Sequence, residues 1–436
     1  MSHFINIGRM IKNRRTLIKS KEHSKALKII ESGLNSARPD LYLKPYFLKN
    51  KLKLGSKTVN LKNFDNTYII AVGKSADYMA DFVSQKINFK AGVVVIPENY
   101  KPIFSNTKFQ FFKSGHPLPN QKSVKAAKYL EKLVSSTKKN DFVIFLVSGG
   151  GSALVSHPMG ISLKEKIIMN DVLIKSGAVI NEISCIRKHL SEIKGGKLLQ
   201  KMNCRGVSLV ISDVIGDDLS VISSGLTFAD NTTFSQALQI IKKYNIQNKT
   251  PKNVINTLEM GKKKKISETP KKPVIKNILI TNNEKCLNRM ENEAKKMNYD
   301  TSIIRNLNSD IKTSTKKIIK RLYTSKKSCI IFGGESTVNV LGTGIGGRNQ
   351  ELVLRISNEL KNNKNQFIIA SIGTDGIDGN TKYAGAIFSN KKLNHAESYL
   401  KNNDSFSFFK KFGGLIYTGP THANVNDIGL IIKQTL

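Results

Sequence analysis

A glycine-rich turn follows one of the most apolar segments of the sequence. Residues 145–154 read FLVSGGGSAL, so Ser-Gly-Gly-Gly-Ser at 148–152 separates an apolar run from a helical pattern. Successive glycines let backbone N–H groups approach an anion closely, and a helix N-terminus adds a favourable partial charge. A nucleophile elbow is excluded, because G-x-S-x-G would need glycine in place of Leu154. We predict an anion-binding loop, with a tight turn that binds no ligand as the alternative.

A lysine occupies a second turn of the same kind. The segment AVGKSA, residues 71–76, is similar to the end of a P-loop, but Tyr68 stands where that loop needs its first glycine. The phosphate-wrapping loop is therefore absent. What remains is Lys74, whose ammonium group on a flexible side chain can neutralise a phosphoryl group. The alternative is an ordinary surface lysine.

Residues 341–352, LGTGIGGRNQEL, contain a literal G-x-G-x-x-G pattern. A dinucleotide-binding fold would place a strand directly before this pattern and an acid about 20 residues after it, to bind a ribose. The preceding segment 333–340 is short and polar at its start, and no acid stands at the expected place. Arg348, directly after the last glycine, suits a phosphoryl group better than close helix packing. A nicotinamide or flavin enzyme is therefore the weaker interpretation.

Acidic residues follow predicted strands in three loops, SDVIGDD (212–218), GGES (333–336) and GTDGIDG (373–379). Hard carboxylate ligands suit Mg²⁺, which keeps several waters and shares phosphate oxygens. We predict that three acids converge on one face and hold this metal or accept a proton: Asp213, Glu335 and Asp375. Other aspartates in the same loops fit turn formation equally well.

Basic residues line a predicted helix that runs into a glycine pair. The segment 186–200, IRKHLSEIKGGKLLQ, carries Arg187, Lys188, Lys194 and Lys197. A charged helix face is usually solvated, but basic groups beside glycines also suit a carboxylate or a phosphate. Glycine loops, isolated cations and Mg-type acids, without a Cys–His–Asp set, are typical of phosphoryl transfer, which depends on positioning and charge neutralisation.

Alternating strands and helices must position these residues. Apolar runs rich in β-branched residues alternate with helical patterns, which is typical of an α/β fold with a largely parallel sheet. A helix is predicted over 163–176, with Ser162 and Glu165 in capping-box register and Gly177 as its stop. The predicted strands are 67–72, 91–96, 142–147 and 207–212, and later 277–281, 301–305, 328–332, 367–373 and 414–419.

A length of 436 residues suggests two or three domains. The lysine-rich segment 261–273, GKKKKISETPKKP, is predicted to be a linker, because like charges repel and its prolines break helices. We predict one α/β domain over 1–265 and a second over 272–436. A cleft between two such domains is a natural ligand site.

The composition is that of a globular protein, with 39% hydrophobic and 23% charged residues. No apolar run reaches the roughly 20 residues that span a bilayer, and residues 1–24 lack the apolar core of a secretory signal. Four cysteines lie far apart without metal-ligand spacing, which favours a reducing compartment. We expect a cytoplasmic protein with no membrane partner.

The formal net charge of +38 raises the hypothesis of nucleic-acid binding. Only 11 of the 70 basic residues are arginine, the side chain suited to bidentate phosphate and base contacts, and the lysines are spread along the chain. A solvated lysine surface is the better interpretation, so we expect no nucleic-acid partner.

Taken together, the motifs resemble the class II glycerate 2-kinases, the glycerate kinase type-2 family with a C-terminal MOFRL domain. Some members of that family carry a hydroxypyruvate reductase label. Nine motifs stand in the family's order along nearly the whole chain: VGKSA (72–76), SGHPLPN (114–120), VSGGGSAL (147–154), IRKHLSEIKGGKL (186–198), SDVIGDDLSVISSG (212–225), GGESTV (333–338), GGRNQEL (346–352), GTDGIDG (373–379) and NVND (424–427).

The resemblance implies a Rossmann-like N-terminal domain and a smaller C-terminal MOFRL-type α/β domain, with the active site in the cleft between them. It implies that ATP phosphorylates D-glycerate at the 2-hydroxyl with Mg²⁺, giving 2-phospho-D-glycerate and ADP. The family's catalytic lysine and arginine fall on Lys74 and Arg348. The anion of the glycine loop then becomes a phosphate of ATP, and the expected nucleotide-binding residues are Ser148, Gly149, Gly150, Gly151, Ser152 and Lys197.

An NAD(P)H-dependent hydroxypyruvate reductase is the alternative function. The sequence leaves open the nucleotide preference and the oligomeric state, for which a homodimer is one alternative. It also leaves open which residues bind the substrate carboxylate, with Arg187, Lys188 and Lys197 as candidates.

Overall fold

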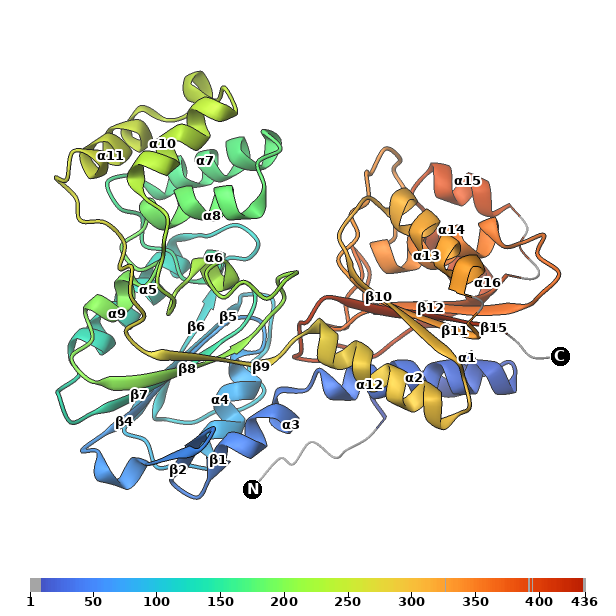
Figure 1. Ribbon diagram of the computed structural model, residues 1–436, viewed down its shortest axis with the longest axis horizontal. Coiled ribbons are helices and arrows are strands. Elements are labelled where there is room, and N and C mark those ends of the chain that lie inside the picture. Colours follow the sequence, from blue (N-terminus) through green and yellow to red (C-terminus); the bar gives the residue numbers. More distant parts are fainter. Residues whose placement is uncertain (1–8, 326, 391–392, 394, 434–436) are drawn as a thin grey trace. The chain divides into compact units, whose positions relative to one another are not determined.

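The structure is a computed structural model that describes residues 9–325, 327–390, 393 and 395–433. Two compact units share the chain: a central unit, Pro39–Ile280, and a composite unit that combines Met1–Arg38 with Thr281–Leu436. Each unit contains its own six-stranded sheet, which confirms the predicted fold of two α/β domains (Figure 1). Their boundaries differ from the predicted ranges, because the N-terminal helices belong to the composite unit. Residues 1–8, which open the basic N-terminal segment, lie outside the described residues.

The sheet of the central unit has the strand order β6-β5-β4-β7-β8-β9. Parallel pairs join β6 to β5, β5 to β4, β4 to β7 and β7 to β8. The chain starts in the middle of the sheet, adds two strands on one side and then crosses to the other side. This is a Rossmann-type order with its topological switch point between β4 and β7. The strands are β4 (Thr67–Val72), β5 (Ala91–Pro97), β6 (Phe109–Ser114), β7 (Phe142–Val147), β8 (Arg205–Ile211) and β9 (Lys276–Thr281).

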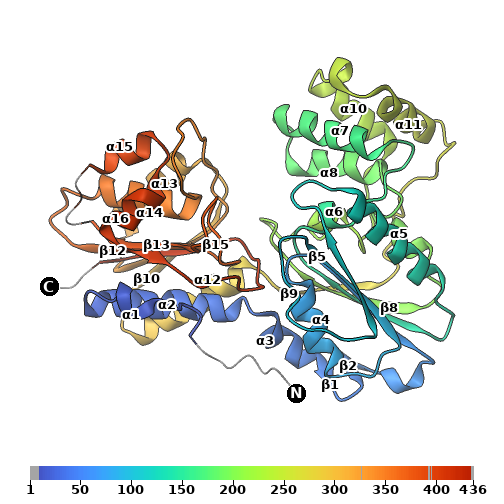
Figure 2. The same cartoon turned by 180° about the vertical axis from the view of Figure 1, so that it is seen from behind.

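Every residue of β4 and β7 is buried. Helices cover both faces of this sheet (Figure 2), so its middle strands are continuous apolar runs without alternation. Ile70, Val95 and Phe145 pack with α5 (Gln121–Ser135) on one face. The helices beside the sheet are α3 (Pro39–Leu43), α4 (Ala76–Ser84), α5 (Gln121–Ser135), α6 (Gly151–Leu154) and α9 (Lys197–Gln200). A small antiparallel sheet contains β1 (Phe47–Leu48), β2 (Lys51–Leu54) and β3 (Lys57–Asn60).

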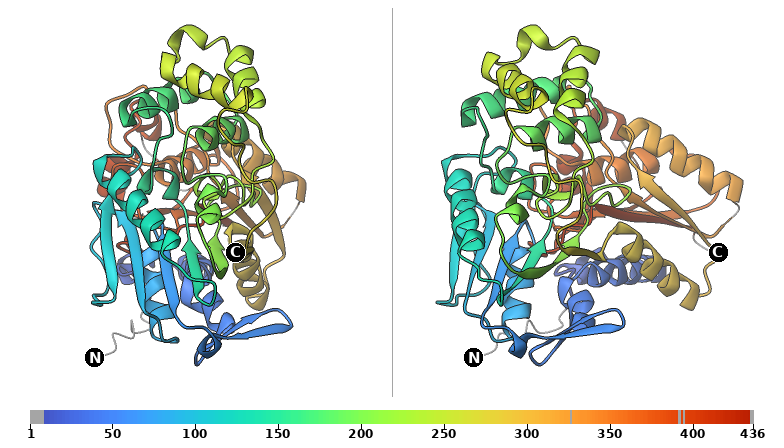
Figure 3. Two further views of the ribbon diagram at one scale, coloured as in Figure 1. Left: turned by 90° about the vertical axis from the view of Figure 1, so that its left-hand side faces the viewer. Right: turned by 60° about the vertical axis from the view of Figure 1, so that its left-hand side comes forward.

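Four further helices form a group at one end of the central unit (Figure 3). They enclose a second apolar core that includes Met169, Leu173 and Phe234. The predicted capping box of the first helix is present, since Ser162 and Glu165 bond each other's backbone N–H groups. The members of the group are α7 (Leu163–Lys175), α8 (Ile180–His189), α10 (Phe234–Lys243) and α11 (Lys252–Lys262).

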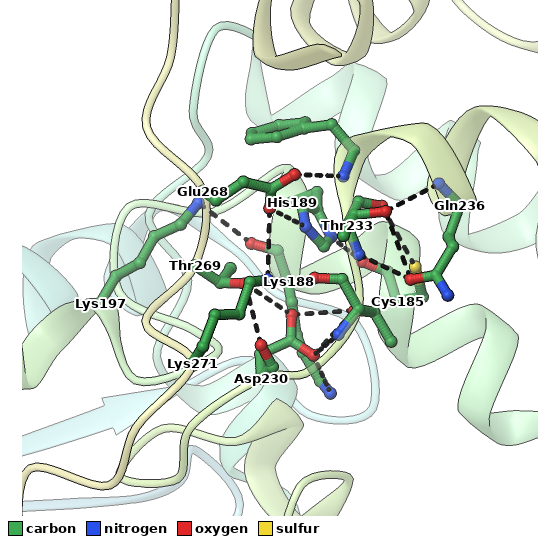
Figure 4. Close-up of polar contacts among 12 residues, drawn as sticks. Cys185, Lys188, His189, Lys197, Asp230, Thr233, Gln236, Glu268, Thr269 and Lys271 are labelled. Carbon is green, nitrogen blue, oxygen red and sulfur yellow. Dashed lines mark hydrogen bonds and ion pairs between the residues drawn. The ribbon is translucent and has the colours of Figure 1, made fainter. Parts of the chain in front are cut away.

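The lysine-rich segment after α11 is anchored on this helical group. Glu268 accepts a hydrogen bond from the N–H of Phe234 at 2.9 Å and contacts His189 Nε2 at 3.1 Å (Figure 4). The hydroxyl of Thr269 donates to Asp230 at 3.0 Å. The chain then continues as β9, which lies beside β8. The segment is therefore not the boundary between the units, which falls at Ile280.

The composite unit has a mixed sheet in the order β10-β11-β15-β12-β13-β14. Its β10 and β11 are parallel, whereas β15 runs antiparallel between β11 and β12. The strands are β10 (Thr301–Leu307), β11 (Cys329–Gly334), β12 (Phe367–Gly373), β13 (Gly385–Ser389), β14 (Leu415–Ile416) and β15 (Asp427–Lys433). The predicted strand at 414–419 is reduced to the two residues of β14.

Helices cover both faces of the mixed sheet as well. On one face α2 packs against α12, where a Cβ added to Gly33 would lie 2.7 Å from Met290 Cγ. This close helix contact holds the N-terminal residues in the composite unit. The helices are α1 (Arg14–Leu17), α2 (Lys21–Ser36), α12 (Asn283–Lys296), α13 (Ile311–Ser325), α14 (Arg348–Glu359), α15 (Ala396–Lys401) and α16 (Ser405–Phe412). Across the described ranges, the helices are all too short or too polar to cross a membrane.

Candidate active site

Two loops flank the switch point of the central sheet. Lys74 follows β4 by two residues, and its backbone N–H donates to the carbonyl of Gly149 at 2.9 Å. The N–H of Ser148, directly after β7, donates to the carbonyl of Val72 at 2.9 Å. The structure thus brings the predicted lysine turn and the predicted glycine loop together. Open α/β sheets bind their ligands at this position, outside the carboxyl ends of the strands.

Close packing explains part of the glycine content of these loops. Gly73 has a φ of +131°, and a Cβ there would lie 2.1 Å from Ser148 Oγ. That hydroxyl accepts a hydrogen bond from the N–H of Ser75 at 3.1 Å, so Ser148 links the two loops. The helix that follows, α6, has four residues, so its dipole adds little to anion binding. The close packing therefore supports a tight turn, and the position of the glycine loop at the switch point supports anion binding.

A histidine that sequence reasoning missed lies against the glycine loop. A Cβ added to Gly150 would lie 3.1 Å from His116 Cδ2 and 3.5 Å from Lys74 Cγ. Burial, and then the charge of Lys74, lowers the pKa of His116 from 6.5 to about 4. The imidazole is therefore neutral at pH 7. The SGHPLPN motif alone assigns no role to this histidine, although a histidine beside glycine and proline in a loop is itself a signal.

A small pocket rich in cations opens beside the end of the glycine loop. It has a volume of about 40 Å³, and we call it the cationic pocket. Its cations come from three elements of the central unit: α7, α8 and the turn before α9. The lining residues are Pro117, Pro119, Ser152, Ala153, Lys166, Asn170, Arg187, Lys194 and Ser224.

The polar side chains of the cationic pocket are held in place by few contacts. Arg187 Nε donates to Asn170 Oδ1 at 2.9 Å, and Lys194 Nζ donates to the carbonyl of Gly151 at 2.8 Å. The hydroxyls of Ser152 and Ser224 lie 2.8 Å apart. Ser152, predicted as a nucleotide ligand, therefore lines this pocket.

Burial lowers the pKa of all three cations of the pocket. Burial, with the charges of Arg187 and Lys197, lowers the pKa of Lys166 from 10.5 to about 8. Burial and the charge of Lys166 lower the pKa of Lys194 well below its usual value, and burial lowers the pKa of Arg187. Among the described residues, no acidic group contributes to any of these three pKa shifts. The pocket is a positive site without a counter-charge.

Two other predicted lysines have partners elsewhere in the central unit. Lys188 Nζ lies 3.1 Å from Asp230 Oδ1, and both side chains are almost fully buried (Figure 4). Lys197 Nζ donates to the carbonyl of Ser191 at 2.8 Å and to that of Lys188 at 3.3 Å. These contacts give both lysines a structural role, so we assign neither to the nucleotide or the substrate carboxylate.

In the composite unit, Arg348 is held by two acids. It is the first residue of α14, and its Nε and Nη2 donate to Asp427 at 2.6 and 3.1 Å. Its Nη1 donates to Glu335 at 2.7 Å. Burial lowers the pKa of Arg348, but the charges of Asp427 and Glu335 together raise it further, so the guanidinium stays protonated. Sequence reasoning missed Asp427 as a site residue, although it ends the NVND motif.

Comparisons with known proteins show the family to which this chain belongs. The model of a domain of unknown function (DUF4147) matches residues 25–259, and that of the MOFRL family matches residues 328–427. The chain is 36% identical over 434 residues to the D-glycerate 2-kinase of Thermotoga maritima, with 93% of this chain and 98% of that protein covered. The chain belongs to the glycerate 2-kinase family. The resemblance inferred from the nine motifs is thereby confirmed.

Further glycerate 2-kinase relatives agree in length and fold. The glycerate 2-kinase of Pyrococcus horikoshii is 35% identical over 403 residues, covering 88% of this chain and 90% of that protein. The crystal structure of glycerate kinase from Thermotoga maritima matches with a TM-score of 0.78 and 34% identity, over 93% of this chain and 98% of that chain. A relative from Agrobacterium vitis with a hydroxypyruvate reductase name is 33% identical over 398 residues, with 84% and 86% covered.

The acids predicted to bind metal in this glycerate 2-kinase family member come from both units. Asp213 follows β8 in the central unit, whereas Glu335 and Asp375 belong to the composite unit. Glu335 is paired with Arg348, and Asp375 Oδ1 accepts a hydrogen bond from the N–H of Ile377 at 3.1 Å. A search of the described residues finds no group of three or more His, Cys, Asp or Glu that could hold a metal ion. The metal-binding role of these three acids stays a prediction.

Asp378 caps α14, the helix that begins with Arg348. Its carboxylate accepts hydrogen bonds from the N–H groups of Asn349 and Gln350 at 3.0 and 2.8 Å. Burial raises the pKa of Asp378 to about 7, against these hydrogen bonds. The aspartate thus serves a turn and a helix start, which is the structural role that the sequence allowed for it.

The G-x-G-x-x-G segment of the composite unit serves packing. A Cβ added to Gly342 would lie 2.3 Å from the carbonyl oxygen of Asn402, and the N–H of Gly342 donates to Asn403 Oδ1 at 3.0 Å. The preceding strand, β11, ends at Gly334, so no strand leads directly into these glycines. The segment therefore lacks the strand–loop–helix geometry of a dinucleotide site.

Proposed function

We propose that this chain transfers the γ-phosphoryl group of ATP to the 2-hydroxyl of D-glycerate, giving ADP and 2-phospho-D-glycerate. The observation that carries the proposal is the meeting of Lys74, His116 and the glycine loop at the switch point of the central sheet. Ligands bind at this position in sheets of this order. The D-glycerate 2-kinase of Thermotoga maritima, related along nearly its whole length, supports the acceptor and the position of transfer.

Phosphoryl transfer needs cations near the transferred group more than it needs a covalent nucleophile. We propose Lys74 and Arg348 as the two catalytic cations. The backbone of Gly149, Gly150 and Gly151 is proposed to contact a phosphate of ATP. Lys74 supplies a mobile point charge, whereas Arg348 supplies a planar fork whose orientation Asp427 and Glu335 fix.

Mg²⁺ is proposed to arrive on the phosphate oxygens of ATP. Magnesium sites of this kind need one or two carboxylates beside substrate oxygens and water, so a cluster of three protein acids is not required. Contacts of Asp213, Glu335 or Asp375 with this ion, or with the hydroxyl proton, stay predictions.

A coupled assay of ADP formation tests the function. D-glycerate, L-glycerate and hydroxypyruvate are compared as acceptors, and ³¹P NMR of the product identifies the phosphorylated carbon. ADP formation that depends on D-glycerate, with the phosphate on carbon 2, is expected. No ADP formation, or NADH oxidation with hydroxypyruvate in the absence of ATP, would overturn the proposal in favour of the reductase name of one relative.

Variants of the two cations test their roles. Lys74→Met and Arg348→Gln are expected to lower kcat at least roughly a thousandfold, the effect typical of losing a charge that stabilises phosphoryl transfer. Lys90→Met, an exposed lysine before β5, and Arg355→Gln, on the same helix as Arg348, are the matched controls. Wild-type turnover in either cation variant would remove that residue from the mechanism.

A further inference from the structure

We propose that the cationic pocket binds the carboxylate of the acceptor, a small 2-hydroxy acid. Lys166 and Arg187 are the residues that contact this carboxylate, with Lys194 supporting the positive charge. The proposal rests on the proposed function, because it names the part of the substrate that this pocket holds.

The first argument is the missing counter-charge. Lys166 lies on α7 and only 5% of its surface is exposed, yet among the described residues no acid forms an ion pair with it or contributes to its pKa shift. A buried charge is strongly unfavourable unless it is paired. Lys194 and Arg187 increase the positive charge at the same place. An anion that enters the pocket would supply the partner that the protein does not.

The second argument is size. A volume of about 40 Å³ is space for about three water molecules, since one needs roughly 10–15 Å³ on this measure. A carboxylate has three heavy atoms and fits this space, whereas the triphosphate chain of a nucleotide is too large. Neutral partners for a short hydroxy acid are present in Ser152, Ser224 and Asn170.

The third argument is position along the chain. Ser152 lines the pocket and directly follows Gly151, the last glycine of the loop at the switch point. Lys194 Nζ donates to the carbonyl of Gly151, so the pocket and the glycine loop share a wall. The hydroxyl of a 2-hydroxy acid is on the carbon next to its carboxylate. An acid held in the pocket therefore presents its 2-hydroxyl close to the phosphate-binding loop, which selects that hydroxyl for transfer.

The chemistry recognised is that of a small oxyanion, and a phosphate of the nucleotide is the other source of such a group. Steady-state kinetics distinguishes the two sources. Lys166→Met and Arg187→Gln are expected to raise the KM for D-glycerate roughly ten- to a hundredfold, as expected when a hydrogen bond to a charged group is lost. The KM for ATP is expected to stay within about twofold. Lys164→Met, an exposed lysine on the same helix, is the matched control and is expected to leave both values unchanged.

Calorimetry without nucleotide tests the pocket independently of turnover. D-glycerate and D-lactate, which both carry a carboxylate and a 2-hydroxyl, are expected to bind the wild-type protein, and glycerol is not. Both variants are expected to lose this binding. Arg187→Lys, which keeps the charge, is expected to recover part of it, and a purely structural role of Arg187 would not give this order.

Two results would overturn the carboxylate assignment. One is an unchanged KM for D-glycerate in both variants, and the other is a rise in the KM for ATP, which would assign the pocket to a nucleotide phosphate. If the wild-type protein forms no ADP with D-glycerate, the proposed function fails, but the calorimetric arm still decides whether the pocket binds small hydroxy acids. If Lys166→Met does not fold, Arg187→Gln, whose side chain is only partly buried, carries the test alone.

Discussion

Replacing Lys166 by methionine is expected to stabilise the ligand-free protein. The pKa of Lys166 is lowered from 10.5 to about 8 by burial and by the charges of Arg187 and Lys197. Each pH unit corresponds to 1.36 kcal/mol, so folding penalises the charged ammonium by about 3 kcal/mol. Methionine has a similar length and no charge, so Lys166→Met removes this penalty without leaving a cavity.

The gain depends on pH with a defined sign. Below about pH 8 the ammonium is charged in both the folded and the unfolded state, and the full penalty applies to the wild-type protein. Between about pH 8 and 10.5 the folded state releases its proton while the unfolded state keeps it, so the penalty shrinks. Above 10.5 it disappears. The free energy of unfolding of Lys166→Met should therefore exceed that of the wild type at pH 7, and the difference should vanish as the pH rises to 10.5.

Urea unfolding followed by circular dichroism, in a buffer without phosphate, sulfate or carboxylate ions, measures this difference. Such anions must be absent because an occupant of the pocket would stabilise the wild-type protein by mass action. Lys164→Met is the control and should give no difference at any pH. A Lys166→Met variant that is less stable than the wild type by 1 kcal/mol or more at pH 7 would refute the reasoning, because it would mean that the ammonium has a stabilising partner.

Three further variants test other groups of the site. Asp427→Asn removes a charged acceptor from Arg348, so kcat should fall roughly ten- to a hundredfold while the KM for D-glycerate stays unchanged. Steady-state kinetics measures both values, and a wild-type kcat would contradict the proposal that Asp427 orients Arg348. Lys188→Met leaves the buried carboxylate of Asp230 unpaired and should lower the free energy of unfolding by about 3–5 kcal/mol. Urea unfolding measures this change, and a loss below 1 kcal/mol would contradict the structural role of the ion pair. His116 has a pKa of about 4 when folded and 6.5 when free, so the wild-type protein should lose about 3 kcal/mol of stability between pH 6.5 and 4. His116→Asn should lack this loss in acid titrations, and an equal loss in that variant would disprove the assignment.

The local sequence pattern predicted several strands that lie in the middle of a sheet, but it missed the central strand β15 of the mixed sheet. The bounds of β4, β7 and β12 agree with the predicted ranges, because these strands are buried on both faces and read as continuous apolar runs. No strand was predicted over 427–433, where β15 lies, and its antiparallel pairing with β11 and β12 had no local signal either, since an apolar run fits a parallel or an antiparallel neighbour. The partner of α2 was also unpredictable, because its contact with α12 joins residues about 250 positions apart in the chain, such as Gly33 and Met290.

The site was predicted where its chemistry is local and missed where it depends on packing. Lys74 and the glycine loop stand in short motifs directly after strands, so their positions could be inferred from the sequence. Lys166 lies on α7, whose other lysines, Lys164 and Lys175, are exposed, and sequence alone does not distinguish the three. The packing of α7 and α8 buries Lys166. His116 was missed for the same reason, since contact with the glycine loop gives it its role.

An acid partner distinguishes two buried lysines of the helical group, Lys188 and Lys166. Lys188, which holds the helical group together, has Asp230 as a buried partner. Lys166 has no acid, although the chain can evidently supply one where a cation is structural. A buried, unpaired charge lowers stability, and an anion that enters the pocket would offset this cost. The protein supplies no carboxylate to the cationic pocket, and in our proposal the carboxylate of the substrate takes that place.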